Sequence, residues 1–579
     1  MLMYRVAALS VACLSLPVAV AFTKKSDRTG WYSCPDKTFS DQGPSSGIIS
    51  ECVVYKAPLC YPGICEALPS VEPTIDIFVK RYPATSGDPA TASNVWFVAG
   101  GPGFASVSME QIMISMHGEL EGKANLYTMD HRGTGRSTLL DCVSTQATTS
   151  GSPLGGDIDL SEVDACAQDL QYKFGDLSSF SITSAATDIA TFISESTNGK
   201  STIVCGFSYG TALVERLMHL KAPTVVGYVL DSVSTTSAAA NDNFPFVSMN
   251  DRDLGEVADA FLDLCVRDEG CSRYFKSTSL PDLLQQLIEK FDKEPNSTCA
   301  QLVSAQGASD PPSISLRATL GSVLLDSTMR AFIPPLVYRL NHCAEGDVTV
   351  LKPFFASPEP QDETEPQDSA YTSVLLYNLI NFSEFYEKPA PPFAVLKERQ
   401  ADATISGGVG LDKTNRFYCA FSKEKSPTCD ELQLGKNSST AIIYKPDQYW
   451  NATSVIPSHA SVLLLSGKLD AETPPKYAKA LFEGLVGSNK ELIAFEHATH
   501  CTIGSTPYSK GGKYMGTCGM KLLASYVKNG GNLDSLDKSC VDEMPALNLT
   551  IPADYLREYL GTDDAYDGNT TRAGSTLST

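Results

Sequence analysis

The stretch that decides the fold is V-C-G-F-S-Y-G-T-A at residues 204–212, in which Ser208 stands between two glycines. The apolar run T-I-V-C-G at 202–206 predicts a strand before the serine, and T-A-L-V-E-R-L-M-H-L at 211–220 predicts a helix after it. A serine on such a sharp strand-to-helix turn has an exposed hydroxyl, and the crowded flanking positions must be small. The pattern therefore indicates a nucleophilic serine rather than an ordinary turn residue.

Short apolar runs, separated by helical stretches, recur on both sides of this turn. Near-continuous apolar strands alternating with helices are typical of a mostly parallel sheet covered on both faces. The sequence thus predicts an α/β fold, with further strands at I-D-I-F-V-K-R-Y (75–82), N-V-W-F-V-A (94–99), L-Y-T-M-D (126–130), V-V-G-Y-V-L-D (225–231), V-L-L-L-S-G (462–467) and E-L-I-A-F-E (491–496).

The interval between the predicted strands at 225–231 and 462–467 lacks this alternation of apolar strands and helices. It contains helical segments and an acidic loop at 357–368. We interpret it as one helical insertion over the sheet, called the cap here; an independent domain is the alternative. The acidic loop is expected to be a solvated connection. The resulting division is a signal peptide (1–21), a Cys-rich segment (22–70), the α/β core (71–232 and 451–545), the cap (233–450) and a C-terminal tail (546–579), polar and expected to be disordered after about residue 560.

A nucleophilic serine needs a base, and the base needs an acid that orients it. In a fold with this turn the chain order is serine, acid, histidine. His497 and His500 both follow the last predicted strand. We expect His500 to be the base because it clears the strand end, and we keep His497 as the alternative.

The acid should follow the preceding strand, where S-G-K-L-D-A-E-T-P-P places Asp470 three residues after Gly467. A carboxylate there would hold the imidazole in the required tautomer and stabilise the imidazolium. Glu472 is the nearest competitor. Asp231, at the end of the strand after the serine, occupies a position that some related folds use, and we interpret it as structural.

Two backbone N–H groups are expected to hold the oxyanion. That of Tyr209 lies at the start of the helix after the serine. The loop A-G-G-P-G at 99–103 brings the backbone near a substrate carbonyl, and Gly101 is the candidate for the second donor. A plain turn is the alternative interpretation of this loop.

The N-terminus M-L-M-Y-R is followed by a short apolar run and by Ala19-Val20-Ala21, which is typical of a secretory signal peptide. Of 17 cysteines, Cys13 lies in that segment and leaves an even number, which favours disulfides in a secreted chain. Six N-x-S/T sequons agree with a secreted glycoprotein: Asn296, Asn381, Asn437, Asn451, Asn548 and Asn569.

The formal net charge of −22 disfavours partners that carry phosphate or anionic lipid, so neither nucleic acid nor a membrane is expected. No later apolar run is long enough to cross a bilayer. No C-x-x-C pair and no H-E-x-x-H occur, so we expect neither a metal nor another cofactor.

Together these motifs resemble the α/β-hydrolase peptidases typified by prolyl aminopeptidase and tripeptidyl aminopeptidase. The similarity lies in A-G-G-P-G (99–103), D-H-R-G-T-G-R-S (130–137), G-F-S-Y-G-T (206–211), V-L-D-S-V (229–233) and D-A-E-T-P (470–474), and the tripeptidyl branch is closest in the last three. The resemblance implies an α/β-hydrolase fold and a secreted serine exopeptidase that removes residues from the free N-termini of peptides.

The resemblance also implies a carboxylate that binds the substrate ammonium. I-N-F-S-E-F at 380–385 places Glu384 as the candidate; an ordinary surface glutamate is the alternative. Two positions depart from the family pattern: Ala99 replaces a histidine before G-G-P-G, and Thr499 replaces a glycine before His500. Two pairs of cysteines are close enough in sequence to be plausible disulfides: Cys265 with Cys271, and Cys501 with Cys518.

Other functions stay open at this level. Serine carboxypeptidases have a glutamate and an asparagine where this chain has Phe207 and Ala99, and an apolar pair cannot bind a C-terminal carboxylate. A secreted carboxylesterase or lipase would use the same three catalytic residues. A catalytically dead hydrolase-fold binding protein is the alternative outside enzymes, although this chain keeps a candidate for each catalytic role.

Overall fold

The computed structural model describes residues 30–145, 157–304, 311–356, 367–407, 411–434, 440–510 and 513–569. The expected signal peptide at 1–21 and most of the acidic loop at 357–368 lie outside these ranges, as does the sequon at Asn437.

A nine-stranded sheet forms the centre of the molecule, with strand order β1-β2-β3-β5-β4-β6-β7-β8-β9. The strands from β5 to β9 in this order run parallel, whereas β1, β2 and β3 add to the edge in antiparallel pairs. This topology, with helices on both faces, is the α/β-hydrolase fold that the sequence predicted. The bounds are β1 (Tyr32–Ser33), β2 (Glu51–Pro58), β3 (Thr74–Tyr82), β4 (Asn94–Val98), β5 (Asn125–Asp130), β6 (Thr202–Phe207), β7 (Val225–Asp231), β8 (Ser461–Gly467) and β9 (Lys490–Phe495).

The seven strands predicted from the sequence are all present, from β3 to β9, with bounds that differ by at most one residue. Two strands were missed, because E-C-V-V-Y-K-A-P at 51–58 had been assigned to a separate Cys-rich segment. In the structure β2 pairs along its whole length with β3, so the segment before residue 70 belongs in part to the core sheet. A small hairpin of β10 (Pro507–Lys510) and β11 (Lys513–Thr517) was also missed.

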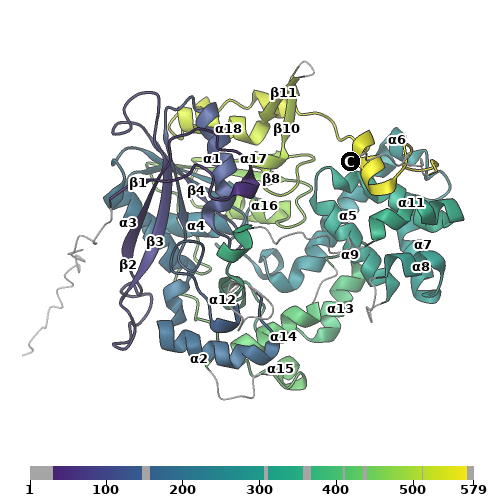
Figure 1. Cartoon of the computed structure of the whole chain (residues 1–579), viewed down its shortest axis with the longest axis horizontal. Helices are drawn as coiled ribbons and strands as arrows, with labels where there is room; N and C mark the ends of the chain where they lie inside the picture. The colour runs from purple at the N-terminus through teal and green to yellow at the C-terminus, as the bar shows by residue number, and fades with distance from the viewer. Residues whose placement is uncertain are drawn as a thin grey trace, which may run out of the picture.

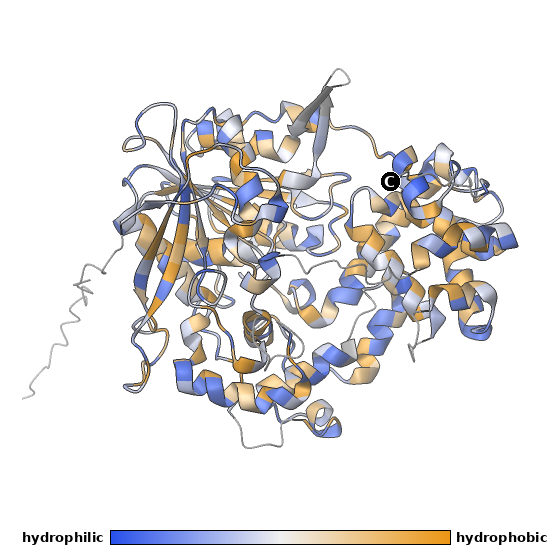
Figure 2. Cartoon of the chain, in the orientation of Figure 1, coloured by the Kyte–Doolittle hydropathy of each residue, from blue (hydrophilic) through white to orange (hydrophobic). Residues whose placement is uncertain are grey.

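Alternate residues of each strand point to opposite faces of the sheet, and each face has its own apolar cluster. On one face α1 (Glu110–Glu119) and α18 (Cys518–Lys528) pack through Met113, Met116, Leu522 and Leu523. The other face is covered by α3 (Ile182–Ser196), α4 (Tyr209–Leu220) and α16 (Pro475–Gly484), with α2 (Val163–Phe174) packed alongside them. In Figure 2 the apolar colouring follows the strands and the inward sides of these helices.

The cap consists of two parts that pack differently. The helices from α5 to α11 share an apolar cluster of their own and lie to one side of the sheet (Figure 1). Residues of α12 and α14 instead belong to the apolar cluster of the core. The bounds are α5 (Asn250–Arg267), α6 (Glu269–Ser272), α7 (Leu280–Lys293), α8 (Thr298–Val303), α9 (Pro312–Leu325), α10 (Ile333–His342), α11 (Glu345–Phe355), α12 (Val374–Glu384), α13 (Phe393–Asp402), α14 (Leu411–Ser422) and α15 (Pro427–Glu431).

The end of the chain returns to the cap. After α17 (Thr502–Ser505) and α19 (Ser539–Asp542), the segment with α20 (Ala553–Tyr555) lies against α6 and α11 (Figure 1). The buried guanidinium of Arg339 donates to the backbone carbonyls of Asp564, Ala565 and Gly568 at 2.6–3.0 Å. Residues 561–569 are therefore ordered against the cap, which corrects the expectation of disorder after about residue 560; residues 570–579 lie outside the described ranges.

In the described part of the chain, seven disulfides join cysteines that are between 5 and 44 residues apart in sequence. The suggested pair Cys265–Cys271 is present. The suggested pair Cys501–Cys518 is wrong, because Cys518 pairs with Cys540 and Cys501 is a free thiol. The other pairs are Cys34–Cys52, Cys60–Cys65, Cys142–Cys166, Cys299–Cys343 and Cys419–Cys429.

One predicted glycosylation site is not at the surface. The side chain of Asn381 belongs to α12, and the residue is only 5% exposed, so its sequon is not available in the folded chain. In the ranges that the structure describes, no helix combines the length and the apolar character needed to span a bilayer.

Candidate active site

Ser208 stands at the tip of the turn between β6 and α4 with φ 54° and ψ −127°, which is a strained backbone for a residue with a side chain. The turn closes only because both flanking positions are glycines. A Cβ at Gly206 would lie 2.4 Å from the carbonyl oxygen of Gly210, and a Cβ at Gly210 would lie 2.4 Å from that of Val98. The geometry is that of a nucleophile elbow.

His500 and Asp470 meet at the carboxyl ends of β9 and β8. The Nδ1 atom of His500 lies 2.9 and 3.0 Å from the two carboxylate oxygens of Asp470. Asp470 is itself held by its own loop, because its Oδ1 accepts from the N–H groups of Glu472 and Thr473 and its Oδ2 accepts from the Thr473 hydroxyl. A carboxylate fixed in this way selects the tautomer that carries its proton on Nδ1 and leaves Nε2 as the base.

The contact between Asp470 and His500 changes the pKa values of both side chains. Burial alone would raise the pKa of the Asp470 carboxyl, but the charge and hydrogen bond of His500 hold it below its usual value. Burial likewise disfavours the imidazolium, but the Asp470 carboxylate, with a contact from Cys501, raises the pKa of His500 well above its ordinary value of 6.5.

This shift predicts the pH dependence of activity. A general base must be neutral, and His500 loses its proton only above its raised pKa. We therefore expect kcat/KM to rise with pH through a midpoint above 6.5, measured in buffers of constant ionic strength on any substrate that the chain hydrolyses. Full activity at pH 5 would contradict the assignment of His500 as the base.

The alternatives left open by the sequence are separated by the structure. His497 lies against the cap, where its carbonyl oxygen accepts from Arg330 at 2.7 Å, and its Nδ1 is buried without a partner among the described residues. Glu472 does not hold Nδ1; its carboxylate lies 3.9 Å from Nε2 of His500. The structure thus brings Asp470 and His500 together and leaves His497 and Glu472 out of that pair.

The two residues expected to supply the oxyanion N–H groups lie in the same pocket as the elbow serine. Gly101, Ser208 and Tyr209 line one pocket. Within the described residues, neither the N–H of Gly101 nor that of Tyr209 has a hydrogen-bond acceptor, as an oxyanion hole requires. Gly100 must also be a glycine here, because a Cβ on it would lie 3.0 Å from Cβ of Ser208.

The hydroxyl of Ser208 has no hydrogen-bond partner in the described part of the chain. Catalytic hydrogen bonds are often long without substrate and shorten when it binds.

The segment D-H-R-G-T-G-R-S at 130–137 does not line the pocket but holds the chain just after the loop at 99–103. Its Asp130 accepts from Arg136 at 2.7 Å and from the N–H of Ser106 at 2.8 Å.

The catalytic pocket has a volume of about 290 Å³ and lies between the core and the cap. Its only charged lining residues in the described ranges are two carboxylates, Asp253 of α5 and Glu472. Asp253 already accepts from Lys476 at 2.6 Å and from the Tyr477 hydroxyl. The apolar part of the lining comes mainly from Pro245, Val247, Leu254, Leu325, Phe385 and Ala471.

Glu384, the predicted anchor for a substrate ammonium, does not line this pocket. It is 2% exposed, its carboxylate pairs with the buried guanidinium of Arg216 at 3.1 Å, and it also accepts from the Tyr444 hydroxyl at 2.6 Å. The structure therefore corrects the expectation of an accessible carboxylate at Glu384. The sequence suggested Glu472 only as a competitor of Asp470 for orienting the histidine, and it did not suggest Asp253 at all. The local sequence does not indicate which residues of the cap face the serine.

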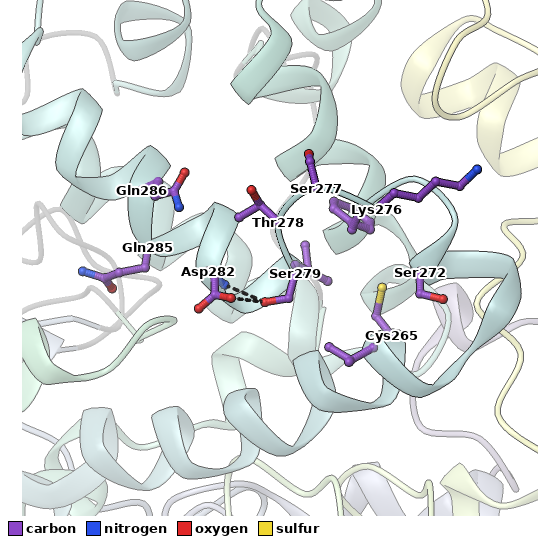
Figure 3. Close-up of a pocket in the computed structure, with 12 residues that line it drawn as sticks. Cys265, Ser272, Lys276, Ser277, Thr278, Ser279, Asp282, Gln285 and Gln286 are labelled. Carbon is purple, nitrogen blue, oxygen red and sulfur yellow. Dashed lines mark hydrogen bonds between the residues drawn. The ribbon is translucent and has the colours of Figure 1, made fainter.

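A larger hollow of about 660 Å³ lies on the cap near the start of α7 and shares no lining residue with the catalytic pocket (Figure 3). Ser279 and Asp282 hydrogen-bond to each other there and cap the helix (Figure 3). Among the described residues there is also no cluster of His, Cys, Asp and Glu side chains arranged to hold a metal ion.

Comparisons with known proteins add little at this level of similarity. No family model matches the chain, and no curated protein sequence does either. Similar solved structures include an esterase from Exiguobacterium antarcticum (12% identity, 74% of this chain and 89% of that one, TM-score 0.25) and the mouse alpha/beta hydrolase domain-containing protein 10 (9%, 80% and 96%, TM-score 0.28). Another is a proline iminopeptidase from Mycobacterium smegmatis (13%, 74% and 89%, TM-score 0.26). With TM-scores this low, the fold is assigned from the strand order and the elbow.

Proposed function

We propose that this chain is a secreted serine exopeptidase that cleaves N-terminal residues or short peptides from substrates with a free N-terminus. Two observations support the hydrolase part: the hydrogen bond of His500 to Asp470, and the elbow serine Ser208, which lines one pocket with Gly101 and Tyr209. His500 takes the proton of Ser208 as the hydroxyl attacks the scissile carbonyl. The N–H groups of Gly101 and Tyr209 bind the oxyanion, and water then releases the acyl group.

The charge of the pocket supports an amine-bearing substrate. Its charged lining residues are carboxylates, and Lys476 already neutralises Asp253. Among the described residues the ion-pair contact of Glu472 is with His500 at 3.9 Å, and about half of its side chain is exposed, so it is the carboxylate that a substrate ammonium would meet. The apolar lining suits an uncharged side chain next to that ammonium.

The rival activities have less support. A carboxypeptidase needs a group that binds a C-terminal carboxylate, but Phe207 and Ala99 are buried and no described lysine or arginine lines the pocket. An esterase would use the same catalytic residues, so only substrates separate it from a peptidase. Secretion stays a proposal, with the signal pattern and the disulfides as its support.

A panel of chromogenic substrates tests the proposal: peptides with a free N-terminus, the same peptides acetylated, and short-chain esters. We expect kcat/KM to be highest for the free peptides. Cleavage of esters alone would instead identify an esterase, and reaction with none of them, together with no labelling by a fluorophosphonate, would favour a binding protein.

Glu472→Gln is expected to raise KM for free N-terminal peptides about 10- to 100-fold, the loss expected when a charge-assisted hydrogen bond is removed. Its kcat should change little, and hydrolysis of acetylated peptides or esters should not change. Steady-state kinetics on matched free and acetylated peptides measures the difference. Glu496→Gln is the matched control, because Glu496 is an exposed glutamate that pairs with Lys468 outside the pocket. An equal effect of Glu472→Gln on both kinds of peptide would remove Glu472 from this role.

A further inference from the structure

The carboxylate of Asp231, at the end of β7, is completely buried and holds the turn that follows His500. Its Oδ1 accepts from the N–H and the hydroxyl of Thr502 at 2.9 and 2.7 Å, and its Oδ2 accepts from the N–H of Ile503 at 2.9 Å. None of the ion pairs between described residues includes Asp231. A buried carboxylate without a direct ion-pair partner depends on such hydrogen bonds, so this turn helps to stabilise its charge.

The same residue also contacts the elbow. The carbonyl oxygen of Asp231 accepts from the N–H of Ser208 at 2.9 Å, and the neighbouring Ser232 hydroxyl accepts from the N–H of Cys501 at 2.8 Å. Ser208, Ser232 and Cys501 have φ of 54°, 60° and 56°, a left-handed region that residues with a side chain rarely adopt. Two of these strained residues, Ser208 and Cys501, are thus hydrogen-bonded to the consecutive residues Asp231 and Ser232, and Ser232 is the third.

We propose that Asp231 is a positioning residue that fixes the turn carrying His500 relative to the elbow carrying Ser208. Asp470 acts on the imidazole ring itself, whereas Asp231 acts on the backbone that carries it. Sequence reasoning had taken Asp231 as merely structural. The inference rests on the proposed function only in that Ser208 and His500 react together, and it requires no particular substrate.

The charge of Asp231 also influences the imidazole. Burial raises the pKa of Asp231 to about 6, although the hydrogen bonds from Ile503 and Thr502 and the charge of His500 oppose that rise. The titratable groups that face the carboxylate are His500 and the thiol of Cys501 from the same turn, and the thiol of Cys205 from β6. Removing this negative charge should therefore lower the pKa of His500.

The test is Asp231→Asn in the full chain, with the rate of labelling by a fluorophosphonate probe as the main readout. The amide oxygen can still accept from Thr502, but the amide nitrogen then faces the N–H of Ile503. We expect labelling and kcat to fall about 10- to 100-fold, because misplacing a catalytic group by about 1 Å costs this much. KM should change little, because the substrate contacts are kept, and loss of the charge should move the acid midpoint of the labelling rate to lower pH.

Ser232→Ala is the control, since it removes the contact to Cys501 and a long hydrogen bond of 3.5 Å to the Asp231 carboxylate without changing a charge. It should slow labelling less and leave the midpoint in place. A wild-type chain that does not label would overturn the proposed function as well as this inference. A wild type that labels, with Asp231→Asn equal to it in labelling rate at the pH optimum of each, would overturn this inference alone, whatever the midpoint. If Asp231→Asn does not fold, Thr502→Val decides: slower labelling supports the inference, and labelling at the wild-type rate overturns it.

Discussion

Asp470→Asn is expected to lose about 10⁴ in kcat while the fold is kept. Oδ1 of Asp470 accepts from two backbone N–H groups, so the amide oxygen of an asparagine would occupy that place. Its NH₂ group would then take the place of Oδ2, which lies 2.9 Å from Nδ1 of His500. Facing a donor, Nδ1 must give up its proton, and Nε2 then carries the proton and cannot accept one from Ser208.

Turnover of the best chromogenic substrate and thermal unfolding are the measurements for this variant. Glu472→Gln controls for the loss of a carboxylate in the same loop and should keep kcat within about tenfold of the wild type. The pH dependence adds a second check, because loss of the Asp470 charge should lower the pKa of His500. Near-normal turnover by folded Asp470→Asn would show that another group orients the imidazole.

Ser208→Ala is expected to lower kcat by about 10⁶ and to abolish labelling by a fluorophosphonate. The loss is this large because no acyl-enzyme can form without the hydroxyl, so only binding and the oxyanion donors remain. Alanine lacks only the hydroxyl and keeps a Cβ at the strained turn, so the fold should be unchanged. Active-site titration and the rate of hydrolysis at enzyme excess measure both effects.

Ser234→Ala is the matched control for this second variant, since Ser234 also lines the catalytic pocket. It should label at the wild-type rate. Labelling that survives in Ser208→Ala and disappears in Ser234→Ala would transfer the role of nucleophile to Ser234.

Short-range patterns predicted the framework of this fold well. The seven strands from β3 to β9 were predicted because each is a near-continuous apolar run with turn or loop residues at both ends. The elbow was found because steric crowding dictates glycine at 206 and 210, a constraint that is local in sequence. The meeting of Asp470 with His500 was also predictable, because parallel strands place their carboxyl ends at one edge of the sheet.

Long-range partners could not be predicted. The local sequence around Glu384 suggests an exposed carboxylate that binds a substrate ammonium. In the structure its ion-pair partner, Arg216 in α4, is 168 residues away in the sequence. Asp253 faces the pocket only because of how the cap packs on the core. Cys518 pairs with Cys540 rather than Cys501, and the spacing of the cysteines in the sequence does not distinguish the two partners.

The disulfides described above all close within the N-terminal part, the core or the cap, and none of them links the cap to the core. Between the two, the contacts are reversible ones, such as Arg216 with Glu384 and Lys476 with Asp253. Oxidative cross-linking therefore constrains the N-terminal part, the core and the cap separately, and the arrangement of the cap on the core depends on noncovalent contacts.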